Sequence, residues 1–301
     1  MRLTALLTLT CVFVAGNCLA EDEFATALKQ PIVSQEQLAK QAAEFVAQRG
    51  AKLEPAESAE AWQREAEALR TKVLDEVVFK GVPEKWREGA PQVEWLDVIE
   101  TGKGYKIKKL RYEAVPGLWI PALLYEPDQL EGKVPAVLNV NGHDSNGKSA
   151  DYKQLRCINL AKRDMLALNT EWLRMGELRG SAYSHDDLAT LDLCGVSGLS
   201  VFYLAMSRGL DVLTSHPHAD LDRVAMTGLS GGGWQTIILS SLDPRIKVSI
   251  PVAGYSSLTQ RVIHHDSIGD LEQNPTDLVK HADYVHLTAL LTPRPALLIY
   301  N

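Results

Sequence analysis

The chain has 301 residues, of which 46% are hydrophobic, and a formal net charge of −7 at pH 7. This length and apolar content can bury the large core of one catalytic domain preceded by an extension. The acidic balance, and the lack of basic clusters interleaved with aromatic residues, argue against nucleic acid as a partner. The sequence has neither Cys-x-x-Cys nor the histidine spacing of a metal site, so we expect no metal and no other cofactor.

Residues 1–20 have the pattern of a secretory signal peptide. Arg2 supplies the positive start, residues 6–15 the apolar centre, and residues 19–20 a small-residue exit before an acidic stretch. An uncleaved membrane anchor is the alternative, but the apolar part is short for a spanning helix. We therefore expect an exported protein, periplasmic or extracellular, without membrane contact after cleavage.

Two cysteines, Cys157 and Cys194, remain after the predicted cleavage. In an exported protein they could form a disulfide. Their apolar sequence surroundings equally favour two buried free thiols. The sequence leaves both interpretations open.

Residues 21–88 are predicted to form a mostly helical N-terminal extension. Residues 21–34 are expected to be mobile, whereas residues 35–48 and 57–79 have helical periodicity. Ser34 and Ser58 are plausible helix start signals. This extension packs on the core as a layer or, alternatively, forms a lid or a wall of a substrate cleft.

Residues 89–301 are predicted to form the catalytic domain, an α/β fold. Three segments with strand patterns come first, at 93–99, 106–114 and 118–125, separated by glycine-containing turns. Strands and helices then alternate, with strands at 134–140, 165–170, 223–228, 248–253 and 295–300 and helices at 152–163, 197–215 and 231–241. This order predicts a mostly parallel sheet that is covered on both faces and has leading antiparallel strands.

The most informative motif is Gly-Leu-Ser-Gly-Gly at residues 228–232. A strand, then G-x-S-x-G, then a helix is the arrangement of a nucleophile elbow, in which the serine takes a strained backbone conformation. Side chains at Gly228 and Gly232 would collide with neighbouring backbone. Ser230 is therefore the predicted nucleophile, and the backbone N–H of Gly231, at the helix start, is a predicted oxyanion donor. A plain glycine-rich turn is the alternative.

A second oxyanion donor is expected from the loop that follows the strand at 134–140. Hydrolases often carry His-Gly-x at this place, and this chain has Asn141-Gly142-His143. We assign the second donor to the backbone N–H of His143. An ordinary Asn-Gly turn is the alternative.

The acid and the histidine of the triad follow the serine in such hydrolases, the acid just beyond a strand placed like 295–300. We therefore expect both beyond Asn301, in a C-terminally incomplete chain, or a scaffold that lacks them. Within the chain, Asp270 or Glu272 is an alternative acid, with capping or salt bridging as the structural reading. His264 or His265 is an alternative base.

A polar cluster follows the strand at 165–170, at the sheet edge where ligands bind in such folds. Its residues could contact a sugar hydroxyl or a carboxylate, and a structural ion-pair network fits them equally well. The cluster comprises Glu171, Arg174, Glu177 and Arg179, and His185 in the same loop could line the cleft.

Several segments resemble one known family. They are residues 142–144 with 146–148, 171–172 with 175–180, the run T-G-L-S-G-G-G-W-Q-T at 227–236, and residues 268–273 and 293–295. Over roughly residues 90–301 the chain resembles the secreted bacterial α/β-hydrolases called acetyl xylan esterase-like, of the dienelactone hydrolase/acetyl xylan esterase type.

The resemblance implies a serine esterase that acts on esters of plant or algal polysaccharides, and we expect a deacetylase of a polysaccharide such as xylan. It assigns the nucleophile to Ser230 and the oxyanion donors to Gly231 and His143, and it assigns no acid or histidine within the chain. A peptidase of the same fold and an inactive carbohydrate-binding scaffold are the alternative functions.

Overall fold

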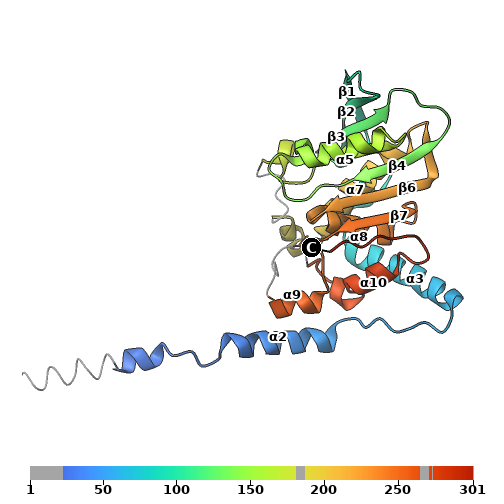
Figure 1. The fold of residues 1–301 in the computed structure, drawn as a ribbon. Coiled ribbons are helices and arrows are strands. Elements are labelled where there is room, and N and C mark those ends of the chain that lie inside the picture. The colour runs from blue at the N-terminus through green and yellow to red at the C-terminus, as the bar shows by residue number, and fades with distance from the viewer. Residues whose placement is uncertain (1–22, 181–186, 265–270, 273, 301) are drawn as a thin grey trace, which may run out of the picture.

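The computed structural model describes residues 23–180, 187–264, 271–272 and 274–300 (Figure 1). Its centre is a mixed sheet of seven strands in the order β1-β2-β3-β5-β4-β6-β7. Helices cover this sheet, so the predicted α/β class with leading antiparallel strands is confirmed.

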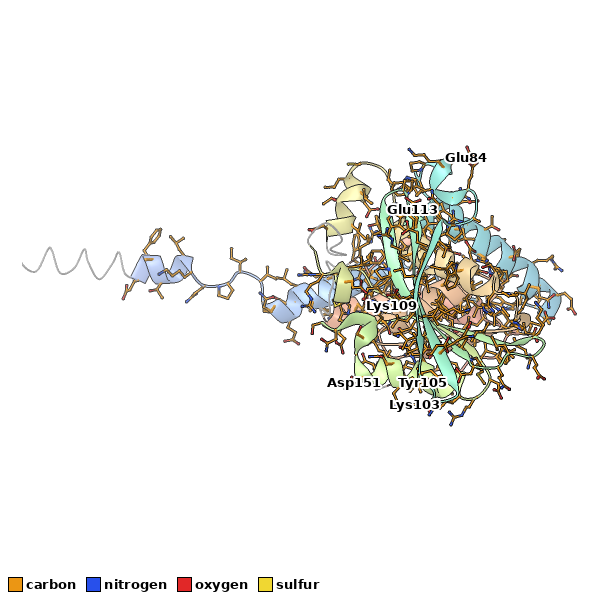
Figure 2. The ribbon with its side chains drawn as sticks, turned by 90° about the horizontal axis from the view of Figure 1, so that it is seen from above. Glu84, Lys103, Tyr105, Lys109, Glu113 and Asp151 are labelled. Carbon is orange, nitrogen blue, oxygen red and sulfur yellow. The ribbon has the colours of Figure 1, made fainter. Side chains whose placement is uncertain are left out.

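The antiparallel part of the sheet is a three-stranded meander. It consists of β1 (Val93–Glu100), β2 (Tyr105–Val115) and β3 (Leu118–Pro127), and β3 also pairs antiparallel with β5 (Leu166–Thr170). In Figure 2 β2 runs from Tyr105 past Lys109 to Glu113. The meander closes one side of the sheet and leaves the parallel strands in the middle and at the other side.

The parallel part of the sheet positions the site. β4 (Val134–Asn139) lies between β5 and β6 (Ala219–Leu229), and β6 pairs with β7 (Val248–Val252). The segment predicted as a last strand, 295–300, runs parallel to β7. Two bridges, Ser249 to Ala296 and Val252 to Ile299, and four backbone hydrogen bonds between residues 295–299 and 249–253 join it to that strand. The carboxyl ends of β4, β5, β6 and β7 meet at one edge of the sheet, as parallel strands require.

Both faces of the sheet are covered because the strands alternate apolar side chains between them. In β5, Leu166 and Leu168 belong to the main core, which contains residues of α7 (Leu199–Thr214) and α8 (Gly231–Leu242). Ala167 points to the other face and belongs to a smaller cluster with residues of α5 (Asp151–Ala161). The predicted helices therefore cover both faces of the sheet, with α7 and α8 on one face and α5 on the other.

The N-terminal helices begin at the predicted start signals. Ser34 caps α2 (Gln35–Arg49) and Ser58 caps α3 (Ala59–Val73), each by accepting a hydrogen bond from the backbone N–H of the third helical residue. A π-helix (Leu74–Val78) continues α3. Its Val77 and Val78 join the main core, so this part of the extension packs on the core.

The first part of the extension contacts the rest of the chain less closely. Residues 23–28 are helical and exposed, and residues 23–34 extend away from the sheet in both views (Figures 1 and 2). α2 contacts α9 (Leu258–His264) without a fully buried residue of its own. None of the helices within the described ranges is long and apolar enough to cross a membrane.

The remaining elements are short and connect the larger ones. They are α4 (Glu84–Arg87), α6 (Thr190–Leu193), α10 (Tyr284–Ala289) and the 3₁₀ turns Gly147–Ser149, Gly176–Leu178, Asp187–Ala189 and Leu278–Lys280.

The two cysteines neither pair nor share one environment. Both are free thiols, Cys157 buried on the inner side of α5 and Cys194 exposed directly after α6. The disulfide interpretation is therefore wrong, and the interpretation of two buried thiols is right only for Cys157. Burial raises the pKa of the Cys157 thiol to about 12. Cys194 follows a helix of four residues that has no buried side chain, and its apolar neighbours in sequence do not cover it.

Glu126, at the end of β3, is a buried carboxylate that the sequence did not single out. Its side chain is 1% exposed and is paired with Lys108 at 2.8 Å, Lys106 at 3.3 Å and His216 at 3.2 Å. Burial alone would raise its pKa, but the bonds from His216 and the two lysines outweigh burial and lower the pKa from 4.5 to about 2. The His216 side chain is mostly buried as a partner of this carboxylate.

Substitution of Glu126 is expected to reduce stability in a pH-dependent way. Because the folded-state pKa is depressed, the contribution is present above the unfolded pKa near 4.5 and is lost as pH falls towards 2. We expect Glu126→Gln to cost roughly 3 kcal/mol of unfolding free energy at pH 7, and the cost to shrink by about 1 to 2 kcal/mol at pH 3. Urea unfolding at both pH values measures this difference.

The matched control is Glu94→Gln, since the pair of Glu94 with Arg111 is about half exposed. It is expected to cost less than ~1 kcal/mol. An equal cost of Glu126→Gln at pH 7 and pH 3 would contradict the ionised state of this carboxylate.

Candidate active site

Ser230 stands at the turn between β6 and α8. Its backbone has φ 60° and ψ −121°, a conformation that non-glycine residues rarely adopt. Its N–H donates to the Val252 carbonyl at 2.9 Å, and its own carbonyl accepts from Gly233 at 2.7 Å and Trp234 at 3.1 Å. These bonds to β7 and to the first turn of α8 hold the strained serine in place, as the sequence predicted for an elbow.

The two glycines of the motif make the close contacts for which they were singled out. A Cβ on Gly228 would lie 2.5 Å from the Gly232 carbonyl oxygen and 2.7 Å from that of Val140. A Cβ on Gly232 would also lie 2.7 Å from the Val140 oxygen. Such distances are far below van der Waals contact, so β4, β6 and α8 can meet here only with glycine at both positions.

The loop after β4 packs directly on the elbow. A Cβ on Gly142 would lie 2.6 Å from the Leu229 oxygen and 2.8 Å from the Gly231 nitrogen. The side-chain Nδ2 of Asn141 donates to Asn169 Oδ1 at 2.6 Å and to the Thr170 carbonyl at 2.7 Å. These bonds connect the loop to the end of β5. The two residues predicted to supply oxyanion donors, Gly231 and His143, are thus neighbours in space.

The imidazole ring of His143, like its backbone, lies beside the start of α8. Its Cε1 is 3.2 Å from where a Cβ of Gly231 would be, and its Nε2 is 3.4 Å from Glu272 Oε2. The imidazole is 39% exposed whereas the carboxylate of Glu272 is fully buried. The sequence motif drew attention only to the backbone N–H of His143, because a loop motif carries no information on what the ring faces.

Glu272 is the second group beside the elbow. Trp172 Nε1 donates to its Oε2 at 3.4 Å, and its Oε1 is 2.7 Å from the Cβ position of Gly231. A carboxylate next to the first residue of α8 also interacts favourably with the helix dipole. Of the two acids considered within the chain, Glu272 therefore lies at the site. Asp270, and with it His185 and His265, lies outside the described residues, as does the side chain of His264.

The polar cluster after β5 is partly buried. Glu171 is 1% exposed and accepts hydrogen bonds from the backbone of Lys148 at 2.8 Å, from its Nζ at 3.1 Å and from the Glu177 N–H at 3.2 Å. Lys148 also pairs with the carboxylate of Glu177, and Arg179 donates to the Ser145 carbonyl.

The ion-pair network is therefore the interpretation that fits Glu171 and Glu177, because their carboxylate oxygens bind groups of the protein itself. Arg174, exposed and at φ 68°, and Arg179 lie on the outside of this network. A contact of these two arginines with a substrate stays a prediction.

Among the described residues there is no group of three or more histidine, cysteine or acidic side chains arranged to hold a metal ion. The chemistry that the site offers is that of Ser230, the backbone N–H groups at Gly231 and His143, and the His143–Glu272 pair.

Residues 200–284, which include Ser230 and Glu272, match the family model of acetyl xylan esterase. A curated relative from Bacillus subtilis, YtaP, provisionally assigned as a hydrolase, is 29% identical over 195 residues, and the match covers 59% of this chain and 62% of the relative. The chain thus spans less than two thirds of that relative.

Solved structures share the fold at low sequence identity. A Bacteroides fragilis structure provisionally assigned as an acetyl xylan esterase has a TM-score of 0.71 at 18% identity, covering 89% of this chain and 75% of that one. Glucuronoyl esterase from Solibacter usitatus has a TM-score of 0.59 at 15% identity, covering 84% and 81%. Acetyl xylan esterase 1 from Thermoanaerobacterium has a TM-score of 0.52 at 19% identity, covering 85% and 81%. Sheet order and the solved structures agree that the chain has the α/β-hydrolase fold, and residues 200–284 are similar to acetyl xylan esterase.

Proposed function

We propose that the protein is a serine carboxylic-ester hydrolase. The observation that carries this proposal is the strained backbone of Ser230, whose neighbours Leu229 and Gly231 pack closely on Gly142. Strain at an exposed turn persists only where the surroundings over-determine it, and it is typical of functional serines. The match of residues 200–284 to acetyl xylan esterase supports the same reaction class.

In the proposed reaction, Ser230 Oγ attacks the ester carbonyl and the alcohol leaves, which forms an acyl-enzyme that water then hydrolyses. The oxyanion of each tetrahedral intermediate is stabilised by the N–H groups of Gly231 and His143. The Gly231 N–H stands at the N-terminus of α8, where the helix dipole favours negative charge.

Serine needs a base to take its proton, and the base needs an acid to orient it. Glu272 is our candidate within the chain for that acid, because its fully buried carboxylate already lies 3.4 Å from an imidazole nitrogen, that of His143. The pairing leaves the His143 ring beside Gly231, open to solvent on one side.

The proposed substrates are acetyl esters of a polysaccharide such as xylan, by analogy with the matched family. We also propose that the protein is exported after cleavage following residue 20. N-terminal sequencing of the secreted protein, which is expected to begin at Glu21, checks that step.

The proposed function predicts acetate release from acetylated xylan and hydrolysis of p-nitrophenyl acetate by the full chain. A peptide p-nitroanilide serves as the comparison, because the amine released from an amide is a poorer leaving group than the phenolate released from the ester. Ester hydrolysis with little amide cleavage is the expected result. Efficient cleavage of the anilide would favour a peptidase, and binding of xylan without turnover would favour a non-catalytic scaffold.

A further inference from the structure

Lys153, on the first turn of α5, is a buried lysine that ends on a backbone carbonyl of the site. Its side chain is 1% exposed, and its Nζ donates to the Gly142 carbonyl oxygen at 3.2 Å. Lysine is almost never fully buried unless its ammonium is compensated, because desolvation of the charge is costly. The burial of this lysine therefore suggests that its ammonium has a role at the Gly142 loop, which it contacts.

Lys153 lies among charges of both signs. Burial, the largest effect, and the Arg156 guanidinium lower the pKa of Lys153 below its usual value, and the carboxylates of Asp144 and Glu171 oppose that shift. Asp144 belongs to the loop after β4, and Glu171 follows β5. Glu171, which the sequence singled out without a settled role, therefore supports a cation next to the site.

The Gly142 carbonyl and the His143 N–H belong to the same peptide group. A peptide group is planar and trans, so its C=O and N–H point in opposite directions. When Lys153 holds the carbonyl on the side of α5, the N–H of His143 is held on the other side of the peptide. The Cα of Gly142 is in turn packed against Leu229 and Gly231 of the elbow, which prevents the loop from moving as a whole.

The neighbouring peptide has a different anchor. Gln235 Nε2, on α8, donates to the Asn141 carbonyl at 2.6 Å, which orients the peptide between Asn141 and Gly142. At the next peptide, the Gly142 carbonyl accepts a hydrogen bond from Lys153.

We propose that Lys153 is a positioning residue for the oxyanion site. Its ammonium fixes the Gly142–His143 peptide so that the His143 N–H faces the oxyanion formed at Ser230. The bond is charge-assisted, and hydrogen bonds in series polarise each other, so the cation also makes this N–H a stronger donor. The inference rests on the proposed ester hydrolysis and adds a specific residue to it.

The test is Lys153→Met in the full chain, since methionine nearly matches the length of lysine but has no N–H. A misdirected donor weakens only the transition state, so we expect kcat on p-nitrophenyl acetate to fall about 10- to 100-fold, with KM changed less than about threefold. Because partial unfolding would also lower the apparent kcat at unchanged KM, kcat is expressed per folded enzyme, with the folded fraction of each variant determined by thermal unfolding.

The matched control is Arg208→Met. Arg208, on α7, is also a buried cation, and it donates to the carbonyls of Trp86, Glu88 and Gly89. Its loss is expected to lower the melting temperature while kcat stays at the wild-type value, because these carbonyls lie before β1 and not in the loop after β4.

A second variant, Lys153→Arg, keeps a cationic donor and carries the test if the methionine variant does not fold. We expect a loss of kcat smaller than tenfold at unchanged KM. An unchanged kcat in Lys153→Met, a rise in KM alone in either Lys153 variant, or an equal loss of kcat in Arg208→Met would overturn the role of Lys153 while ester hydrolysis by the wild type stands. Absence of ester hydrolysis in the wild type would instead overturn the proposed function, and the inference with it.

Discussion

Replacement of Ser230 by alanine is expected to abolish ester hydrolysis, with kcat reduced by about 10⁴-fold or more, as for removal of the nucleophile from other serine hydrolases. The side chain of Ser230 stands on a turn with φ 60° that links β6 to α8. Alanine fits the same backbone, because the β-carbon is retained. The fold should therefore survive, and the loss should fall on kcat.

The measurement is initial rates on p-nitrophenyl acetate and acetylated xylan, with the melting temperature determined for each variant. Ser241→Ala is the control, since Ser241 lies near the end of the same helix and its hydroxyl donates to the Ile238 carbonyl at 3.1 Å. Its kcat should equal that of the wild type. Turnover retained by Ser230→Ala would mean that another nucleophile does the chemistry.

Replacement of Gly254 by alanine is expected to damage both stability and the site. Gly254 has φ +86°, and a Cβ there would lie 1.7 Å from the carbonyl oxygen of Ser230. That oxygen accepts from Gly233 and Trp234, so it cannot retreat without breaking the first turn of α8. We expect unfolding free energy to fall by more than ~3 kcal/mol, because overpacking adds to backbone strain, and we expect kcat to fall in the protein that still folds.

Gly104→Ala separates the two causes. Gly104 has nearly the same φ, +87°, but a Cβ there would meet no heavy atom within 4 Å. It therefore suffers only the left-handed backbone penalty, about 1–2 kcal/mol. Urea unfolding of both variants measures the difference. Equal losses in the two would show that the contact between Gly254 and Ser230 does not constrain the elbow.

Most of the fold is predictable from the sequence because its determinants are local. Alternating apolar residues define β2 and β3, and Ser34 and Ser58 begin their helices by bonding to backbone a few residues ahead. The segment 295–300 follows the same rule. Its apolar run predicts a strand, and four backbone hydrogen bonds and two parallel bridges join it to β7.

The candidate site divides along the same line. The motif at 228–232 by itself predicts the turn at Ser230, because a strand and a helix can join so tightly only through glycines that admit close backbone contact. The loop at residues 141–143 was likewise recognisable from its place after a strand. Both predictions concern backbone within one short segment.

Residues far apart in the sequence supply the rest, and only the tertiary structure brings them together. Glu272 contacts His143 and Trp172, and Lys153 donates to Gly142. Glu171, which the sequence offered as a possible sugar ligand, is a buried partner of Lys148. A charged side chain in a sequence looks the same whether water or a buried partner will solvate it. The sequence thus determined the candidate nucleophile and the sheet that presents it, whereas packing decided which charges are desolvated and which of them lie beside the site.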